Sequence, residues 1–418
     1  MQRAPTASGS DWGSNVGFDV GFDVQLSRVV RIASIVSAIF SCGCSTLPTD
    51  AKNPSQSTTP VRVASARTYT QVAAGFVHTC ALAANGAAYC WGSNEYSQLG
   101  SSLATDSCGG RPCSKTPIAV RGGHTFTFLA AGWVHNCGIA SDTRTFCWGG
   151  GAIERQGYLG DGTLSSSDTP VAVVADSAFK SVTIGDGHSC ALTASGMAFC
   201  WGQNAWGQLG DGTQTDRASP VVVSTDVRFR SLSAGAYHTC GITLDNDAYC
   251  WGDNRWGQLG RGAVQYNTVG NIVAQPQRVT GGIAFAAIAG GWEHTCAITT
   301  SGAAYCWGRN EDDRQLGDDS DVSHRGTPGR VSGDLTFVSL TAGALATCGR
   351  TAAAELFCWG ANYYGGLGNG EMVASGVAHP VRTLGGPFAR VTLGQAHACA
   401  IATDQSLWCW GDQSVGQF

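Results

Sequence analysis

Cysteine and histidine are the residue types of this 418-residue chain whose spacing is best suited to chemistry. Fourteen of its 18 cysteines form pairs ten residues apart, and most pairs follow a histidine, as in His78-Thr79-Cys80 before Cys90-Trp91-Gly92. Closely spaced cysteines form disulfides, or they bind zinc together with histidine. The pairs are Cys80 and Cys90, Cys137 and Cys147, Cys190 and Cys200, Cys240 and Cys250, Cys296 and Cys306, Cys348 and Cys358, and Cys399 and Cys409.

The spacing of ten residues favours disulfides. An Asn85-Gly86 turn halfway between the first two cysteines predicts a tight β-hairpin, which places Cys80 directly opposite Cys90. Opposed residues of an antiparallel pair lie ~4.5–5.5 Å apart at Cα, within disulfide range. Zinc is one alternative, but Ala346 replaces the histidine in the sixth copy while the cysteine pair remains. Reduced cysteines that act as small core residues are the other.

A further pair, Cys108 and Cys113, lies in the Gly-rich insertion Cys-Gly-Gly-Arg-Pro-Cys. We expect an eighth disulfide there rather than a metal site, because no other pair of ligands is near it in the sequence. Eighteen cysteines are more than a reduced cytosolic chain usually carries. The cysteine content therefore favours an oxidising compartment.

The cysteine pairs belong to a unit that recurs seven times: Gly-x-x-His-x-Cys, nine residues, then Cys-Trp-Gly. Successive first cysteines are 57, 53, 50, 56, 52 and 51 residues apart. Each copy follows a proline and a run rich in β-branched residues, and its local pattern predicts about four short strands, the content of one propeller blade. The sequence therefore predicts an all-β repeat protein.

The unit resembles the regulator of chromosome condensation (RCC1) repeat family. The resemblance implies a seven-bladed β-propeller over residues 60–418, with repeats of 50–57 residues. The seventh copy has no Pro-Val strand after it, so the ring closure of the family implies that the segment around Pro60–Val63 completes the last blade. Such a clasp would remove an exposed sheet edge.

The regularity of the repeated histidines and tryptophans indicates packing rather than ligand binding. Each histidine is expected to form a hydrogen bond with the backbone of its own or the next blade. The tryptophans of Cys-Trp-Gly are expected to pack between blades; they are Trp91, Trp148, Trp201, Trp251, Trp307, Trp359 and Trp410.

The positions that differ between copies are the candidates for binding. Family resemblance places the corner between glycine and histidine at one end of the propeller, where partners dock. Aromatic side chains there are typical binding anchors. The candidate face consists of Phe76, Trp133, Tyr237 and Trp292, with a second set at Tyr96, Trp206, Trp256 and Tyr364. The alternative is that several of these rings only fill gaps between blades.

The first 44 residues predict an N-terminal extension that contains an export signal. Arg28 and Arg31 precede an uncharged run over residues 32–40, and small residues follow, as in a signal peptide. The run is too short to span a membrane as a helix.

The cysteines after this run indicate an anchor. Cys42 or Cys44 resembles the lipidated cysteine of a bacterial lipoprotein, and a cleaved secretory signal is the alternative. Residues 45–59 are rich in Ser, Thr and Pro and are expected to form a flexible linker. The protein would then be exported, as an outer-membrane, periplasmic or cell-surface lipoprotein or as a secreted protein.

Composition and motifs argue against several functions. The net charge is −5, with three lysines among 25 basic residues, so no nucleic acid is expected as a partner. No nucleophile elbow, P-loop, zinc-protease motif or dinucleotide fingerprint is present, so neither an enzyme nor a cofactor is expected. The acids at 311–313 and 318–321 lack the spacing of a Ca²⁺ loop.

We therefore expect a monomeric, lipid-anchored binding propeller that recognises a protein or glycan on one face and meets the membrane only through its anchor. Two alternatives come from the family: a guanine-nucleotide exchange factor for a small GTPase, and a secreted propeller similar to the member that inhibits β-lactamases. A photoreceptor branch carries Gly-Trp-Arg-His at the corner. Val134 and Glu293 replace that arginine here, so a Trp–Arg dimer switch is not expected.

Overall fold

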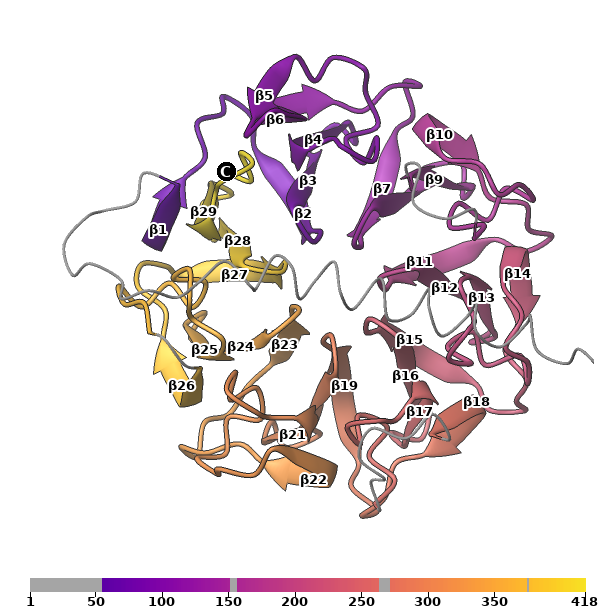
Figure 1. The fold of residues 1–418 in the computed structure, drawn as a ribbon, viewed down its shortest axis with the longest axis vertical. Helices are drawn as coiled ribbons and strands as arrows, with labels where there is room; N and C mark the ends of the chain where they lie inside the picture. Colours follow the sequence, from indigo (N-terminus) through magenta and orange to yellow (C-terminus); the bar gives the residue numbers. More distant parts are fainter. Residues whose placement is uncertain (1–54, 151–155, 263–270, 374–375) are drawn as a thin grey trace, which may run out of the picture. The chain divides into compact units, whose positions relative to one another are not determined.

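The computed structural model describes residues 55–150, 156–262, 271–373 and 376–418. Within these ranges, 29 strands form seven antiparallel sheets arranged in a ring (Figure 1). The chain is therefore the predicted seven-bladed β-propeller. No helix in the described ranges has the length and apolar character needed to span a membrane. The predicted signal segment, with Cys42 and Cys44, lies outside the described residues.

Six blades contain four strands, and the first contains five, because β5 (Asp106–Cys108) pairs with the edge of its fourth strand. The strands follow one another outward from the axis in the order of the chain, except in the last blade, where the N-terminal strand is the outermost. The innermost strands surround the axis (Figure 1); they are β2 (Tyr69–Ala74), β7 (Phe126–Ala131), β11 (Phe179–Ile184), β15 (Phe229–Ala234), β19 (Phe285–Gly290), β23 (Ser339–Ala342) and β27 (Phe388–Leu393). The second strands, which begin at the repeated histidine position, are β3 (His78–Ala83), β8 (His135–Ala140), β12 (His188–Thr193), β16 (His238–Thr243), β20 (His294–Thr299), β24 (Ala346–Arg350) and β28 (His397–Ala402).

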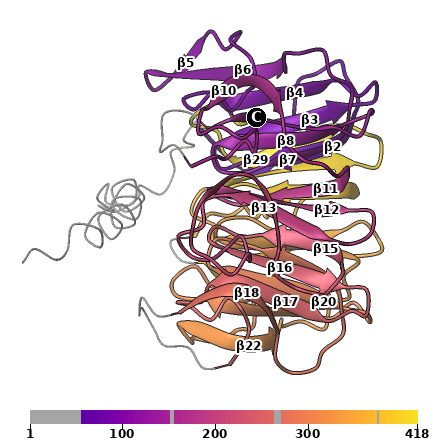
Figure 2. The same cartoon turned by 90° about the vertical axis from the view of Figure 1, so that its right-hand side faces the viewer.

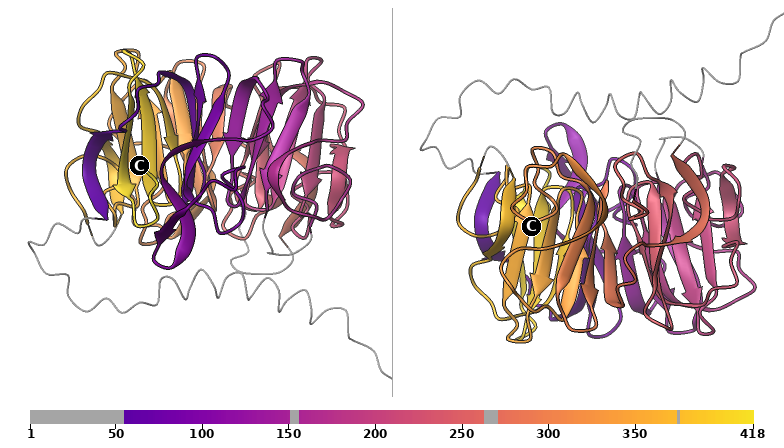
Figure 3. Two further views of the ribbon diagram at one scale, coloured as in Figure 1. Left: turned by 90° about the horizontal axis from the view of Figure 1, so that it is seen from above. Right: turned by 90° about the horizontal axis from the view of Figure 1, so that it is seen from below.

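The outer half of each blade carries Cys-Trp-Gly and the Pro-containing strand. The third strands are β4 (Ala88–Ser93), β9 (Thr145–Gly149), β13 (Ala198–Gly202), β17 (Ala248–Asp253), β21 (Ala304–Arg309), β25 (Leu356–Gly360) and β29 (Leu407–Asp412). The outermost strands are β6 (Arg111–Ala119), β10 (Ser167–Ala172), β14 (Arg217–Val222), β18 (Ile272–Arg278), β22 (His324–Arg330) and β26 (Val377–Arg382), with β1 (Gln56–Arg62) in the last blade. Seen edge-on, the strands run across the ring from one end to the other (Figure 2; Figure 3).

The register of the second and third strands places the cysteines of every pair opposite one another. Cys80 faces Cys90 in β3 and β4, and the same register recurs in all seven blades. The structure joins the seven pairs as disulfides with Cα atoms 4.1 Å apart. Cys108 and Cys113 form an eighth, between β6 and the additional edge strand β5 (Asp106–Cys108).

The last blade is closed by the N-terminal strand, as the family resemblance implied. β1 pairs with β29, and Gln56 and Ser57 lie opposite Asp412 and Gly411. The strand therefore begins at Gln56, so the end of the segment expected as a linker belongs to the propeller. The physical reason is that β29 presents an unpaired edge that runs on to Asp412, long enough to pair with residues before Pro60.

The hydrophobic core lies between neighbouring blades. The Cys-Trp-Gly tryptophans are all fully buried. Trp148 and Phe126 of the second blade pack against the Cys80–Cys90 disulfide and Leu99 of the first. The tryptophans thus pack between blades, as the regularity of the repeats indicated.

Candidate functional site

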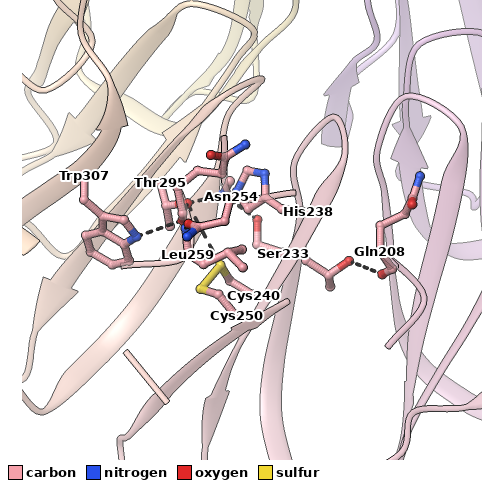
Figure 4. The surroundings of a disulfide bond; sticks show 12 residues. Gln208, Ser233, His238, Cys240, Cys250, Asn254, Leu259, Thr295 and Trp307 are labelled. Atoms are coloured by element: carbon pink, nitrogen blue, oxygen red, sulfur yellow. Dashed lines mark hydrogen bonds between the residues drawn. A yellow bond between two sulfur atoms is a disulfide. The ribbon is translucent and has the colours of Figure 1, made fainter. Parts of the chain in front are cut away.

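The repeated histidines link each blade to the next through side chains. His78 Nε2 lies 2.8 Å from Asn136 Oδ1, and His238 Nε2 lies 2.9 Å from Thr295 Oγ1 (Figure 4). His135, His188, His294 and His397 make the equivalent contact with Ser189, Thr239, Thr347 and Thr79. The expectation of a backbone partner was wrong. In most copies the residue after the histidine position carries a hydroxyl or amide group, and this group forms the hydrogen bond with the histidine of the preceding blade.

The partner residue also fixes the tautomer of His238. Thr295 Oγ1 donates to the carbonyl oxygen of Gln258 at 2.8 Å, so it accepts from His238 Nε2–H. The same carbonyl accepts from Trp307 Nε1 at 2.9 Å, beside the Cys240–Cys250 disulfide (Figure 4). Burial lowers the pKa of His238 to about 3, and the repeated histidines are therefore neutral.

The Gly-x-x-His corner requires glycine because the histidine ring folds back beneath it. A Cβ added to Gly75 would lie 2.1 Å from Cε1 of His78, and one on Gly291 would lie 2.1 Å from Cε1 of His294. A side chain at this position would therefore displace the histidine. The glycine is therefore present in all seven copies, whereas the residue after it differs between blades.

Corners from all seven blades meet at the axis, where the innermost strands end. They line a hollow of ≈110 Å³, which we call the axial hollow. Most of its wall is glycine and alanine. The larger or polar side chains in the wall are Phe76, Trp133, Ile184, Asp186, Trp292, Leu393 and Gln395.

Three of the predicted aromatic residues lie together in this hollow. The ring of Phe76 contacts Trp133 and Trp292 edge-on, with centroids 5.7 and 6.1 Å apart. All three rings are partly exposed. We call Phe76, Trp133 and Trp292 the aromatic trio; partly exposed rings of this kind bind apolar surface or cations.

The other predicted aromatic residues lie outside the axial hollow. Tyr237 packs beside Trp206, with centroids 6.3 Å apart, and the guanidinium of Arg255 lies 4.1 Å above the Trp206 ring. Trp206 is 7% exposed, so it fills a gap between loops, as the alternative interpretation proposed. Tyr96, Trp256 and Tyr364 are partly buried at the equivalent turn.

Charged residues next to the aromatic side chains were not predicted as site residues. Trp292 Nε1 donates to Oδ2 of Asp186 at 3.0 Å. Arg309 Nη1 lies 2.9 Å from Glu293 Oε2, and Arg255 pairs with Asp253 at 3.0 Å.

Burial raises the pKa of the Asp186 carboxyl to about 7; the Trp292 hydrogen bond opposes this effect and the Glu293 charge adds to it. The only signal in the sequence was that Asp186 is the one acidic residue at the variable corner position, where the other copies carry an aromatic residue, alanine or, at Gln395, glutamine.

The disulfides occupy the sulfur atoms that a zinc site would require. Among the described residues, no group of three His, Cys, Asp or Glu side chains is arranged to hold a metal ion. The axial hollow offers a partner three aromatic rings and one partly buried carboxyl group.

Comparison with known proteins places the chain. The RCC1-like domain matches residues 38–382, and the regulator of chromosome condensation (RCC1) repeat matches residues 388–417. The ultraviolet-B receptor UVR8 of Arabidopsis thaliana is 30% identical over 353 residues, which cover 83% of this chain and 66% of the receptor. The chain thus spans only part of the length of this relative.

Solved structures agree on the fold. Prp20p from Saccharomyces cerevisiae superposes with a TM-score of 0.67 at 21% identity, covering 82% of each chain. Human WBSCR16 gives a TM-score of 0.70 at 20% identity, covering 88% of this chain and 94% of its own. Two matching family models and a seven-bladed ring of the same repeats lead to one conclusion: the chain belongs to the RCC1-like family of β-propeller proteins.

Proposed function

We propose that the protein is an exported, lipid-anchored and non-enzymatic propeller that binds a protein partner at the axial hollow. The observation that carries this proposal is the aromatic trio, three partly exposed rings gathered where the seven corners meet. Trp and Phe side chains are enriched in protein interfaces, and Trp is frequent among the residues that contribute most of the binding energy. Prp20p, of the same fold, is described as binding Gsp1p and histones.

Export is supported by the disulfides. Eight cross-links hold the blades, and such a number is typical of proteins that fold in an oxidising compartment. Cys42 or Cys44 would carry the lipid, and residues 45–55 would tether the propeller to the membrane. The partner would then be an extracytoplasmic protein.

Photo-crosslinking in the native host tests the binding face. A photo-crosslinking amino acid at Gln395, in the wall of the hollow, should give a discrete adduct with the partner. The double variant Trp133→Ala and Trp292→Ala should lose the adduct and keep its melting temperature. Tyr96→Ala, outside the hollow, is the matched control and should keep the adduct. Loss of folding in the double variant, or an unchanged adduct, would contradict the proposal.

Intact mass before and after reduction tests export. We expect a chain that begins at Cys42 or Cys44, carries acyl groups and holds eight disulfides. A full-length chain with free thiols would contradict export, and it would favour the alternative of a cytosolic GTPase regulator.

A further inference from the structure

We infer that the axial hollow binds an alkylammonium cation, and that this cation is a lysine side chain of the protein partner. The inference rests on the proposed function and names the chemistry that the partner must bring. It follows from the composition of the hollow wall, in which three aromatic rings lie together with a carboxyl group that has no basic partner among the described residues.

The aromatic trio supplies the faces. Phe76 lies between Trp133 and Trp292, and both contacts are edge-on, so the three rings do not stack face to face. A ring face carries negative electrostatic potential and attracts ammonium groups within ~6 Å of its centroid. The hollow of ≈110 Å³ is several times the ~10–15 Å³ that one water needs, so it has room for the end of an alkylammonium chain.

Asp186 supplies the charge. Among the described residues that line the hollow, it is the only charged one. Its Oδ2 accepts from Trp292 Nε1, while Oδ1 accepts no hydrogen bond from any described residue. No ion pair joins Asp186 to a basic side chain within the described ranges, whereas neighbouring Glu293 is already paired with Arg309. A carboxylate in an apolar wall without a cation is stabilised by a ligand that brings one.

Glycine and alanine make up most of the remaining wall, and Gln395 is the only neutral side-chain amide among the described residues of the lining. An anion would meet Asp186 without any basic group to offset it. An uncharged apolar group would bury the carboxyl without a partner. An ammonium group at the end of an apolar chain matches both parts of the wall. Its methylene groups would pack on the aromatic rings, and its charge would pair with the Asp186 carboxylate.

The protonation of Asp186 gives the inference a pH dependence. Asp186 is neutral in part near its pKa of about 7, and an ammonium ligand would lower that pKa. Glu293 and the Tyr237 hydroxyl are the other titratable groups that interact with Asp186; Glu293 is paired, and burial holds the Tyr237 pKa far above neutrality. Affinity should therefore rise from pH 6 to pH 8 and level off above.

Calorimetric titration of the full chain tests the inference with three probes: Nα-acetyl-lysine methylamide, the uncharged Nα-acetyl-norleucine methylamide, and choline. The lysine probe should bind about tenfold more tightly than the norleucine probe. Asp186→Asn keeps the acceptor for Trp292 and should remove this tenfold preference. Asp312→Asn, an exposed acid of the same charge, is the matched control and should retain it.

Equal binding of the lysine and norleucine probes, or a preference that survives Asp186→Asn, would overturn the cation site. Tighter binding of choline than of the lysine probe would overturn the assignment to lysine. The crosslinking experiment separates the two proposals: if Asp186→Asn keeps the adduct at Gln395 while the tryptophan double variant loses it, the binding face stands and the cation site falls.

Discussion

His397 Nε2 lies 3.0 Å from Thr79 Oγ1 and joins the last blade to the first across 318 residues of sequence. Thr79 in turn donates to the carbonyl oxygen of Gln417, which also accepts from Trp91. The same contact from a histidine to a hydroxyl group joins four other pairs of neighbouring blades, and His78 contacts the amide oxygen of Asn136 in the same way. The ring is therefore closed by the same kind of hydrogen bond that joins its other blades. The sixth blade is the exception, because Ala346 replaces histidine and Ala398 stands at the partner position of the seventh.

Replacing the closing histidine should weaken the ring. His397→Ala removes the partner of a buried hydroxyl and should lower the free energy of unfolding by about 1–3 kcal/mol in urea denaturation. Ala346→His is the control: it should bring no stabilisation, because Ala398 offers no hydrogen-bond acceptor. An unchanged midpoint for His397→Ala would show that the interblade bond contributes nothing measurable.

Removing the clasp strand should expose the edge of β29. A chain that begins after Arg62 lacks β1 and should melt at a lower temperature and self-associate in light scattering, because an unpaired edge strand pairs with other chains. A chain that begins at Ser55 retains β1 and should keep the melting temperature of the full chain. Equal melting temperatures for the two truncations would contradict the role of the clasp.

The buried histidines should make the propeller sensitive to acid. Burial lowers the pKa of His135, His188, His238, His294 and His397 from 6.5 to about 3, and that of His78 to about 4. Between the lowered pKa values of the folded protein and the ordinary value of 6.5, the unfolded chain binds protons that the folded chain does not. Stability is therefore fully present above pH 6.5 and falls as the pH drops toward 3.

Acids with raised pKa values oppose this trend in part. Asp186, Glu293 and Asp313 have raised pKa values because of burial, so they favour the folded state as the pH falls. Because the histidines outnumber these acids, we expect the free energy of unfolding, measured by urea denaturation, to fall between pH 7 and pH 5. His238→Gln keeps an amide donor and does not titrate. It should therefore make the free energy of unfolding depend less steeply on pH, by the equivalent of about one proton. A stability curve that is level over this range would contradict the assignment of neutral histidines.

The repeats determined most of what the sequence could predict. A hairpin turn between two cysteines fixes their register, so Cys240 and Cys250 could be paired without a structure. The closing strand followed from the family resemblance, but its start at Gln56 depends on how far the edge of β29 extends. That length is a tertiary property, and the composition of the preceding segment does not encode it.

The candidate site was predicted less completely. Phe76, Trp133 and Trp292 share a corner position, and the ring of seven blades brings such positions together at the axis. Trp206 has the same residue type but lies at a different turn, where Arg255 and Tyr237 cover it. The role of Asp186 depends on its distance from Trp292, two blades away in the ring, and no local pattern reports such a contact.

The hydrogen bond between Trp292 and Asp186 can be tested through the carboxyl group itself. Trp292→Phe keeps an aromatic ring but removes the Nε1–H that stabilises the charged form of Asp186. The pKa of Asp186, about 7 in the native protein, should therefore rise in a carbon-13 NMR titration of the carboxyl groups. Trp133→Phe is the matched control and should leave it unchanged, because no hydrogen bond joins that indole to Asp186 among the described residues. A pKa unmoved by Trp292→Phe would mean that burial alone keeps the carboxyl neutral.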